Sequence, residues 1–295
     1  METYLGIDGG GSKTRALLVD ANGRPLHYSE SGPSNLNVYS KASVQASLRA
    51  VIDECLQVVN TQPFATCLGL AGAGNPETGR KLEAIVDPLG LGKFRIVSDA
   101  EIALEGAFSG GPGILLIAGT GSVCLAKSAN GSTHQCGGWG WLADDAGSAA
   151  WIGQRALEAA VQQNDGRLEG QRLKDEVFAH LEIKDSKDIS NRLYQPLLER
   201  SQLAELAKLV LQLAENGDDD AQLIQISALK ELEKLVRATA RVAGIHATVA
   251  LAGGLLSHNQ SFRRALEGRL SDFTIQEPEF NQLEGAVAQA RKIRK

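Results

Sequence analysis

Residues 11–23 read GSKTRALLVDANG, and residues 119–131 repeat the pattern as GTGSVCLAKSANG. A glycine, a leucine and the closing Ala-Asn-Gly coincide, and hydroxyl side chains are kept at two more positions, where Ser12 corresponds to Thr120 and Thr14 to Ser122. Each copy lies between apolar runs and ends at an Asn-Gly turn signal, which is typical of a β-hairpin. The repeat predicts a duplicated domain with two such turns facing each other across a cleft. Chance similarity between two common hairpins is the alternative.

Apolar periodicity predicts the elements around these hairpins. Short apolar or alternating runs indicate strands, and apolar residues three to four positions apart indicate helices. The predicted strands are 3–7, 14–20, 24–31, 65–71, 94–98, 113–118, 122–127, 133–136, 248–252 and 273–276. The predicted helices are 41–60, 76–87, 99–108, 148–163, 259–270 and 283–294, with a long helical stretch over 170–244. The order predicts an α/β fold whose second half carries a helical insertion.

Composition and charge narrow the class of protein. A chain of 295 residues is long enough for two domains. Its net charge of −5 argues against binding nucleic acid or an anionic membrane through bulk charge. The four cysteines form no CxxC pair, so neither a disulfide framework nor a zinc ribbon is predicted. With no signal-peptide pattern and no apolar run of ~20 residues, the reducing cytoplasm is the expected location.

The first hairpin turn, GIDGGGSKT over residues 6–14, has the features of a phosphate loop. Glycines let the backbone approach a ligand closely, and successive N–H groups can surround an anion. The candidate nucleotide-binding residues are Gly10, Gly11, Ser12, Lys13 and Thr14. Asp8 ends the strand, where a carboxylate can hold a hydrated Mg²⁺. Because a strand follows, the phosphate would be held by a hairpin and not by the helix of a P-loop. A plain tight turn is the alternative.

Two further glycine turns are candidate nucleotide contacts. The segment AGTGS over 118–122 repeats the first loop and offers Gly119, Thr120 and Gly121 to phosphates. The segment LAGGL over 251–255 joins a strand to a helix, and Gly253 and Gly254 permit close approach of a flat ring such as adenine. Each of these is also consistent with a bare turn.

Asp99 lies between a predicted strand and a predicted helix. Two interpretations are open: an N-cap worth about 1 kcal/mol, or a base that orients a substrate hydroxyl for in-line attack on phosphorus.

The segment CGGWGWLADDAGSAAWIG over 136–153 is rich in glycine, tryptophan and aspartate. Sugar sites combine an apolar plane with carboxylates that accept from hydroxyls, and Trp139 and Asp145 fit that description. A helix N-terminus beside core tryptophans is the alternative. Trp141 and Trp151 are interpreted as packing residues.

Taken in order, these motifs resemble the BadF/BadG/BcrA/BcrD ATPase family, and within it the N-acetylglucosamine kinases of the hexokinase–actin–Hsp70 superfamily. The resemblance spans essentially the whole chain. It implies two ribonuclease-H-like (actin-like ATPase) domains with a cleft between them. The implied domains are 1–108 plus 283–295, carrying sugar and phosphate loops, and 109–282, carrying the second phosphate loop and the adenosine site.

The resemblance also implies roles for individual residues. ATP would lie in the cleft with Mg²⁺ near Asp8, held through water, and Ser12 and Thr120 would contact phosphates. Asp99 would be the catalytic base that removes the proton of the sugar 6-hydroxyl. The implied sugar-binding residues are Asn35, Asp99, Ser122, Gly138, Trp139, Gly140 and Asp145. Asn37 is a second candidate for the Asn35 position, and Gly253 and Gly254 match the adenosine turn.

One departure leaves the substrate open. Many relatives carry Gly-Asp-Glu-Gly-Ser where this chain has Asp144-Asp145-Ala146-Gly147-Ser148. The altered charge can favour free glucosamine, whose amine is cationic, whereas Asp144 would repel the lactyl carboxylate of N-acetylmuramate. The expected reaction is ATP-dependent phosphorylation of an amino sugar, most simply N-acetylglucosamine, with glucosamine or another hexose derivative as the alternative.

Two functions of other classes are alternatives to a kinase. An ATPase activator of 2-hydroxyacyl-CoA dehydratases needs cysteines that bridge an iron–sulfur cluster between subunits. A sugar-sensing regulator usually adds a DNA-binding segment, for which the chain leaves no room before its first strand. The expected partners are therefore an amino sugar and ATP. A homodimer is the default for a soluble oligomer, with the region 170–244 as the expected contributor.

Overall fold

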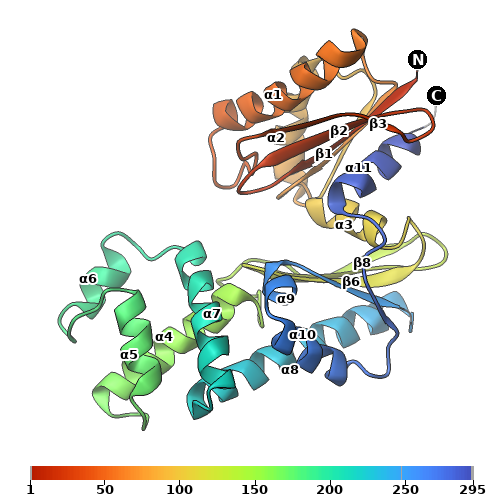
Figure 1. Ribbon diagram of the computed structural model, residues 1–295. Helices are drawn as coiled ribbons and strands as arrows, with labels where there is room; N and C mark the ends of the chain where they lie inside the picture. Colours follow the sequence, from red (N-terminus) through yellow and green to blue (C-terminus); the bar gives the residue numbers. More distant parts are fainter. Residues whose placement is uncertain (1, 247, 294–295) are drawn as a thin grey trace. The chain divides into compact units, whose positions relative to one another are not determined.

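The computed structural model describes residues 2–246 and 248–293. Contacts divide the chain into two compact units, coloured along the sequence in Figure 1. Unit 1 runs up to Gly113 and resumes at Glu277, and unit 2 is Ile114–Gln276. The predicted domain boundaries, 108/109 and 282/283, lie a few residues from these divisions and stay a prediction, as does the cleft. No helix in the described ranges is long and apolar enough to cross a lipid bilayer.

Unit 1 holds a mixed sheet flanked by helices. Its strands are β1 (Thr3–Gly9), β2 (Thr14–Asp20), β3 (Pro25–Ser31), β4 (Ala65–Leu70) and β5 (Phe94–Val97), in the spatial order β3-β2-β1-β4-β5. Its helices are α1 (Lys41–Val59), α2 (Pro76–Val86), α3 (Asp99–Ala107) and α11 (Gln282–Arg291), with a 3₁₀ turn at Asp87–Leu89. The β1–β2–β3 pairs are antiparallel, whereas β1, β4 and β5 are parallel.

Successive residues of a strand point to opposite faces, and β1 uses both faces. Leu5 and Ile7 lie in a core with apolar residues of α1 and α2. Gly6 faces α11, where a Cβ would lie 2.6 Å from the backbone nitrogen of Val287, so a side chain has no room there. Figure 1 shows the resulting layers, with α1 and α2 on one side of the sheet and α3 and α11 on the other.

Unit 2 repeats the plan. Its strands are β6 (Gly113–Ala118), β7 (Ser122–Lys127), β8 (Thr133–Gly137), β9 (Val249–Ala252) and β10 (Ile275–Gln276), in the order β10-β9-β6-β7-β8. When β6 is matched with β1, this order corresponds strand for strand to that of unit 1. The internal repeat thus marks the same hairpin, β1–β2 in one unit and β6–β7 in the other, and the predicted duplication is confirmed.

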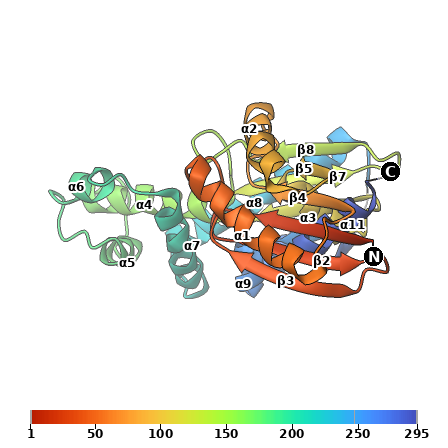
Figure 2. The same cartoon turned by 90° about the horizontal axis from the view of Figure 1, so that it is seen from above.

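Helices of unit 2 cover its sheet and extend beyond it. They are α4 (Ala149–Asp165), α5 (Arg172–His180), α6 (Ile189–Tyr194), α7 (Arg200–Glu215), α8 (Asp219–Ala243), α9 (Gly254–His258) and α10 (Gln260–Arg269). Ile114 and Leu116 of β6 share a core with apolar residues of α4, α7 and α8. Figure 2 shows α5 and α6 on the side of α7 opposite the strands, beside α4, which is the predicted helical insertion.

The insertion is divided where the sequence predicts a break near residues 215–220. Helix α7 ends at Glu215, and Gly217 follows with φ +81°. Asp218 then begins α8 by accepting the backbone N–H of Ala221 at 2.9 Å. This cap satisfies one of the otherwise unpaired donors of the first helical turn.

Candidate functional site

The β1–β2 turn presents a row of exposed residues. The backbone N–H of Gly10 donates to the carbonyl of Lys13 at 3.0 Å, which closes the turn. Gly11, Ser12 and Lys13 are exposed at its tip, and no atom lies within 4 Å of the place where a Gly11 side chain would begin. The Lys13 ammonium lies 2.8 Å from the Glu30 carboxylate. The turn therefore offers backbone N–H groups and one hydroxyl outward.

Thr14 lies inside the protein, where it holds a neighbouring loop. Its hydroxyl donates to the Gly32 carbonyl at 2.8 Å and lies 2.8 Å from the Ser34 hydroxyl. Ser34 in turn donates its N–H to the Gly10 carbonyl at 3.0 Å. These bonds fix residues 32–37 beside the β1–β2 turn. Within that loop Asn35 is half-buried and Asn37 is exposed, so the choice between them as sugar ligand stays a prediction.

Asp99 does not cap its helix. Ser98 is the N-cap: its hydroxyl accepts the N–H of Glu101 at 3.1 Å, and the Glu101 carboxylate accepts the Ser98 N–H at 3.3 Å. Of the two interpretations of Asp99, the N-cap is therefore wrong, because the preceding serine already completes a capping box. Asp99 is the first helical residue, and its carboxylate accepts the N–H of Ala100 at 3.0 Å.

The surroundings of Asp99 favour its protonated form. Burial is the main cause of its raised pKa, and the charge of Asp8 adds to it, while the Ala100 N–H acts in the opposite sense. The influence of Asp8 also shows that the two carboxylates lie within electrostatic reach of each other. A carboxylate with a raised pKa accepts a proton more readily than a solvated one, which is the property required of a general base.

Asp8 is nearly buried, at 8% exposed, and forms an ion pair with Arg15 of the adjacent strand. Arg15 also donates to the side-chain oxygen of Gln282 at 3.3 Å. Across the described ranges no cluster of three or more His, Cys, Asp or Glu side chains could enclose a metal ion. Mg²⁺ in phosphoryl-transfer sites usually needs only one or two carboxylates, with waters and phosphate oxygens. A single carboxylate at Asp8 fits that mode of binding.

The second glycine loop is anchored to α4. The N–H of Gly119 donates to the Gly121 carbonyl at 2.9 Å, and the N–H of Ala149 donates to the Gly119 carbonyl at 2.9 Å. Ser122 donates its hydroxyl to the Ala146 carbonyl at 3.0 Å. The β6–β7 turn and the start of α4 therefore form one rigid corner.

This loop and the 253–254 turn border one pocket of about 640 Å³, within the usual size range of ligand sites. Its lining includes the predicted residues Gly119, Thr120 and Gly254. Gly253 has φ +99°, and a Cβ there would lie 2.3 Å from the Ala118 carbonyl oxygen. Only glycine fits this position, because it alone tolerates both the backbone angle and the contact. The structure thus brings together two turns far apart in the sequence.

The other wall of this pocket comes from α7, which sequence reasoning missed. Ser201, Ala204 and Lys208 line it from successive turns of the helix, together with His258 and Asn259. Lys208 is exposed and places an ammonium group at the wall. The sequence does contain a signal: the small residues Ser201 and Ala204 lie on the same helical face as Lys208. Taken alone, this spacing indicates only the predicted helical insertion.

Asp145 lies beside the second loop in a buried position, 3% exposed, with the positive φ of +59°. Its carboxylate accepts the N–H of Ser122 at 3.2 Å and lies 2.7 Å from the guanidinium of Arg200. Burial raises the pKa of Asp145, and the charge of Arg200 opposes that change. Arg200 is a second residue that sequence reasoning missed, since nothing in its neighbourhood distinguishes it from other helical arginines.

The Gly138-Trp139-Gly140 segment forms an exposed loop. Both glycines have positive φ, +79° and +97°. The Trp139 side chain is 77% exposed, and its backbone N–H donates to Asp144 at 3.2 Å. The Trp139 ring is therefore free to meet a ligand, while Asp144 holds the loop in shape.

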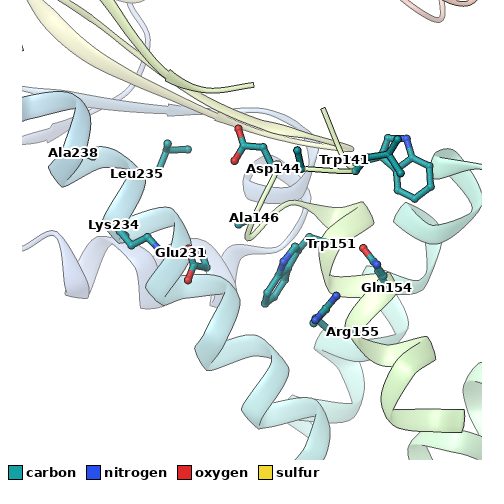
Figure 3. A pocket seen from close by; sticks show the side chains of 12 residues that line it. Trp141, Asp144, Ala146, Trp151, Gln154, Arg155, Glu231, Lys234, Leu235 and Ala238 are labelled. Atoms are coloured by element: carbon teal, nitrogen blue, oxygen red, sulfur yellow. Dashed lines mark hydrogen bonds and ion pairs between the residues drawn. The ribbon is translucent and has the colours of Figure 1, made fainter. Parts of the chain in front are cut away.

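A further pocket of about 500 Å³ lies between α4 and α8. Figure 3 shows Trp151 and Arg155 projecting from α4 toward Glu231 and Lys234 of α8. Trp141 and Trp151, predicted to be packing residues, do pack against the core and also border this space. None of the predicted sugar-binding residues lines it, although Asp144 does.

Proteins of known function resemble the chain over most of its length. It is 33% identical over 265 residues to the N-acetylmuramic acid/N-acetylglucosamine kinase of Clostridium acetobutylicum, covering 88% of this chain and 87% of that protein. It is 28% identical over 259 residues to the N-acetyl-D-glucosamine kinase of Dictyostelium discoideum, covering 83% and 81%.

Solved structures share the fold. A protein of Chromobacterium violaceum, provisionally named an N-acetylglucosamine kinase, matches with a TM-score of 0.81 and 28% identity over 99% of both chains. The ROK-family glucokinase of Streptomyces griseus matches with a TM-score of 0.58 and 15% identity over 99% of this chain and 100% of that one, which concerns the fold alone. These matches confirm the predicted two-domain, actin-like fold class. The profile of the BadF/BadG/BcrA/BcrD ATPase family matches residues 5–290, so the chain belongs to that family.

Proposed function

We propose that the chain transfers the γ-phosphoryl group of ATP to the 6-hydroxyl of N-acetylglucosamine. The coarser statement, that it is an ATP-dependent amino-sugar kinase, follows from its family and from the relatives named above. The observation that carries the finer proposal is Asp99, a partly buried carboxylate with a raised pKa, no capping duty and a second carboxylate nearby.

Asp99 is the proposed general base. A sugar hydroxyl attacks phosphorus more readily when a carboxylate accepts its proton as the new bond forms. The position of Asp99 at the start of α3 holds the carboxylate by its own backbone, through the Ala100 N–H. Orientation of this kind supplies effective concentration without any further chemistry from the protein.

ATP is proposed to contact both glycine loops. In unit 1 the contacts are Gly10, Gly11, Ser12 and Lys13. The buried Thr14 supports this turn through its hydrogen bonds to Gly32 and Ser34. In unit 2 the contacts are Gly119, Thr120 and Gly121 for phosphates, and Gly253 and Gly254 for adenosine. Asp8 would hold Mg²⁺ through water, and the ion when bound neutralises charge on the phosphate oxygens. The proposal requires both units to act on one ATP, so the predicted cleft is part of it.

The sugar is proposed to contact Asn35 in unit 1 and the loop around Trp139 in unit 2, with Ser122, Gly138, Gly140 and Asp145. The exposed Trp139 ring supplies the apolar plane that sugar faces prefer. Asp145 supplies a carboxylate already held in place by Ser122 and Arg200. These contacts suit a neutral polyhydroxylated ring.

The choice of N-acetylglucosamine rests on the relatives. Both proteins named above have this sugar in their names, and one also has N-acetylmuramic acid. A glucosamine kinase of Vibrio cholerae is 30% identical over 188 residues, covering 61% of this chain and 62% of that protein. Glucosamine is therefore the second candidate substrate.

The cysteines give no support to an iron–sulfur ATPase activator. Burial raises the pKa of Cys55, Cys67 and Cys124 to about 12, and Cys136 is only half-exposed. Cluster ligands must be thiolates that can reach the metal. The buried thiols instead pack as small apolar groups.

The test is a coupled assay of ADP release with Mg-ATP and a panel of N-acetylglucosamine, glucosamine, N-acetylmannosamine, N-acetylmuramate, glucose and no sugar. We expect strong stimulation by N-acetylglucosamine, with the product identified as the 6-phosphate by NMR. Steady ATP hydrolysis that no sugar stimulates would overturn the proposal. Sedimentation of the same sample tests the predicted homodimer.

A further inference from the structure

Arg200, the first residue of α7, lies against the second phosphate loop. Its Nη2 is 2.7 Å from an Asp145 carboxylate oxygen. A Cβ built on Gly121 would lie only 1.9 Å from the same nitrogen, so the guanidinium rests directly on the backbone of that glycine. Glycine at 121 thus makes room for a cation beside the loop.

The Arg200 side chain is 35% exposed, so part of its guanidinium is accessible to a ligand. Arginine carries five N–H donors in a planar fork. The contacts described above involve Nη2 alone, and Nε is buried without a hydrogen-bond partner in the parts of the chain that the structure describes. The buried Nε is out of a ligand's reach, but the exposed part of the guanidinium is available to an acceptor that a ligand supplies.

The position of Arg200 relative to the pocket identifies that acceptor. Thr120 and Ser201 line the pocket. Gly121 directly follows Thr120 in the chain, and Arg200 directly precedes Ser201. With adenosine at the Gly254 turn and phosphates at Gly119 and Thr120, the terminal phosphate extends toward Gly121. Asp145, the proposed sugar carboxylate, adjoins the same loop: its oxygens lie 3.0 Å from the place where a Gly121 side chain would begin, beside the Arg200 guanidinium.

We propose that Arg200 is a catalytic residue whose guanidinium binds oxygens of the γ-phosphoryl group during transfer. This inference rests on the proposed function. In the reaction the sugar O6 forms a bond to the γ-phosphorus, and its proton passes to the Asp99 carboxylate. The bond from the γ-phosphorus to the β–γ bridging oxygen breaks, and ADP leaves with the electron pair. Arg200 donates to the non-bridging oxygens, where its planar fork suits two acceptors at once.

Asp145 has a second task in this arrangement. Before ATP binds, its buried carboxylate neutralises Arg200 and holds the guanidinium on the Gly121 backbone. Preorganised charge of this kind needs no rearrangement when negative charge develops on the transferred group. Arg200 and the carboxylate assigned to the sugar therefore meet beside the loop assigned to the phosphates.

The experiment compares Arg200→Met and Arg200→Lys with the wild type. Titration calorimetry with Mg²⁺ measures affinity for ADP and for the β,γ-imido analogue of ATP, and the coupled assay measures turnover. We expect Arg200→Met to leave ADP affinity within about twofold, to weaken binding of the ATP analogue at least about tenfold, and to lower kcat by roughly 10²–10³-fold. Arg200→Lys keeps the charge but not the fork, and should recover only part of each loss.

Arg167→Met is the matched control. Arg167 pairs with Asp165 on the exposed end of α4 and lines neither pocket described here, so its removal should change no affinity and no rate. Thermal unfolding of each variant tests for folding, and Arg200→Lys gives the answer if Arg200→Met is unfolded.

Equal losses of ADP and ATP-analogue affinity would overturn the proposal, because the guanidinium would then serve the loop and not the γ-phosphate. A higher KM for sugar with unchanged kcat would also overturn it and leave Arg200 as a support for Asp145. If the wild type phosphorylates no sugar, the proposed function fails, yet the comparison of ADP with the ATP analogue still decides whether Arg200 senses the γ-phosphate.

Discussion

Ser98 accepts a hydrogen bond from the backbone N–H of Glu101 over 3.1 Å, and this bond leaves the Asp99 carboxylate out of the cap of α3. Ser98 thus stabilises the helix, and the Asp99 carboxylate remains available for chemistry. Substituting each residue in turn therefore separates the effect on stability from the effect on catalysis.

We expect Ser98→Ala to lower the stability of unit 1 by about 1 kcal/mol, the usual value of an N-cap, and to leave kcat within about twofold. Asp99→Asn should instead lower activity and not stability. It keeps the shape of the side chain but removes the base, so kcat should fall by about 10²–10⁴-fold while ATP and sugar affinities stay close to wild type. Chemical denaturation and steady-state kinetics on both variants check this. An Asp99→Asn enzyme with near-normal kcat would remove Asp99 from the role of base.

The raised pKa of Asp99 also predicts a dependence of stability on pH. A carboxyl group whose pKa is higher in the folded state than in the unfolded chain stabilises the fold below its ordinary pKa, and this contribution is lost as pH rises through the raised value. Ionised Asp99 is therefore unfavourable at neutral pH. Asp99→Asn should have a higher Tm than the wild type at pH 7, and the difference should shrink as the pH falls from the raised pKa to the ordinary aspartate pKa.

Differential scanning calorimetry at several pH values measures this difference. Asp165→Asn is the control, since the pKa of Asp165 is lowered by its hydrogen bond with Arg167 and its removal should not raise the Tm. A Tm difference for Asp99→Asn that is the same at every pH would contradict the expected ionisation.

Gly253 provides a test of the adenosine turn. Alanine there would combine a backbone angle of φ +99° with a contact of 2.3 Å to the Ala118 carbonyl, so the turn must move away from β6. We expect Gly253→Ala to weaken nucleotide binding at least tenfold, with a smaller effect on sugar affinity. Gly217→Ala is the matched control, because Gly217 has φ +81° but open space around it and lies outside the pocket.

Both substitutions place an alanine at positive φ, which costs roughly 1–3 kcal/mol. Only Gly253→Ala also forces its Cβ against the Ala118 carbonyl oxygen, beside the proposed second phosphate loop. Equilibrium titration with ADP distinguishes the two contributions. Equal loss of ADP affinity in both variants would indicate general destabilisation and would remove Gly253 from the nucleotide site.

Local patterns predicted the fold well, because both hairpins and most helix ends depend on neighbouring residues. The break at Glu215–Asp220 is an example: Gly217 and the Asp218 cap are readable from residue type alone. The Ser98–Glu101 box was readable too, as Ser-x-x-Glu before an apolar run, and would have decided the role of Asp99. Arg200 and the α7 wall were not readable. They reach the glycine loop through folding of an insertion some 80 residues downstream, and no short-range pattern encodes that contact.

Asp144 is expected to set the discrimination between neutral and acidic sugars. It adjoins the proposed sugar carboxylate Asp145 and accepts the Trp139 N–H at 3.2 Å, so its charge lies within the proposed sugar-binding loop. Two like charges about 4 Å apart repel by ~1 kcal/mol even in water, which is about a fivefold effect. Asp144→Asn should therefore raise kcat/KM for N-acetylmuramate at least fivefold relative to N-acetylglucosamine. Asparagine keeps an oxygen that accepts the Trp139 N–H, so the loop should retain its shape, and Asp144→Ala, which lacks it, separates loss of charge from loss of the hydrogen bond. An unchanged ratio in Asp144→Asn would place the lactyl group away from this residue.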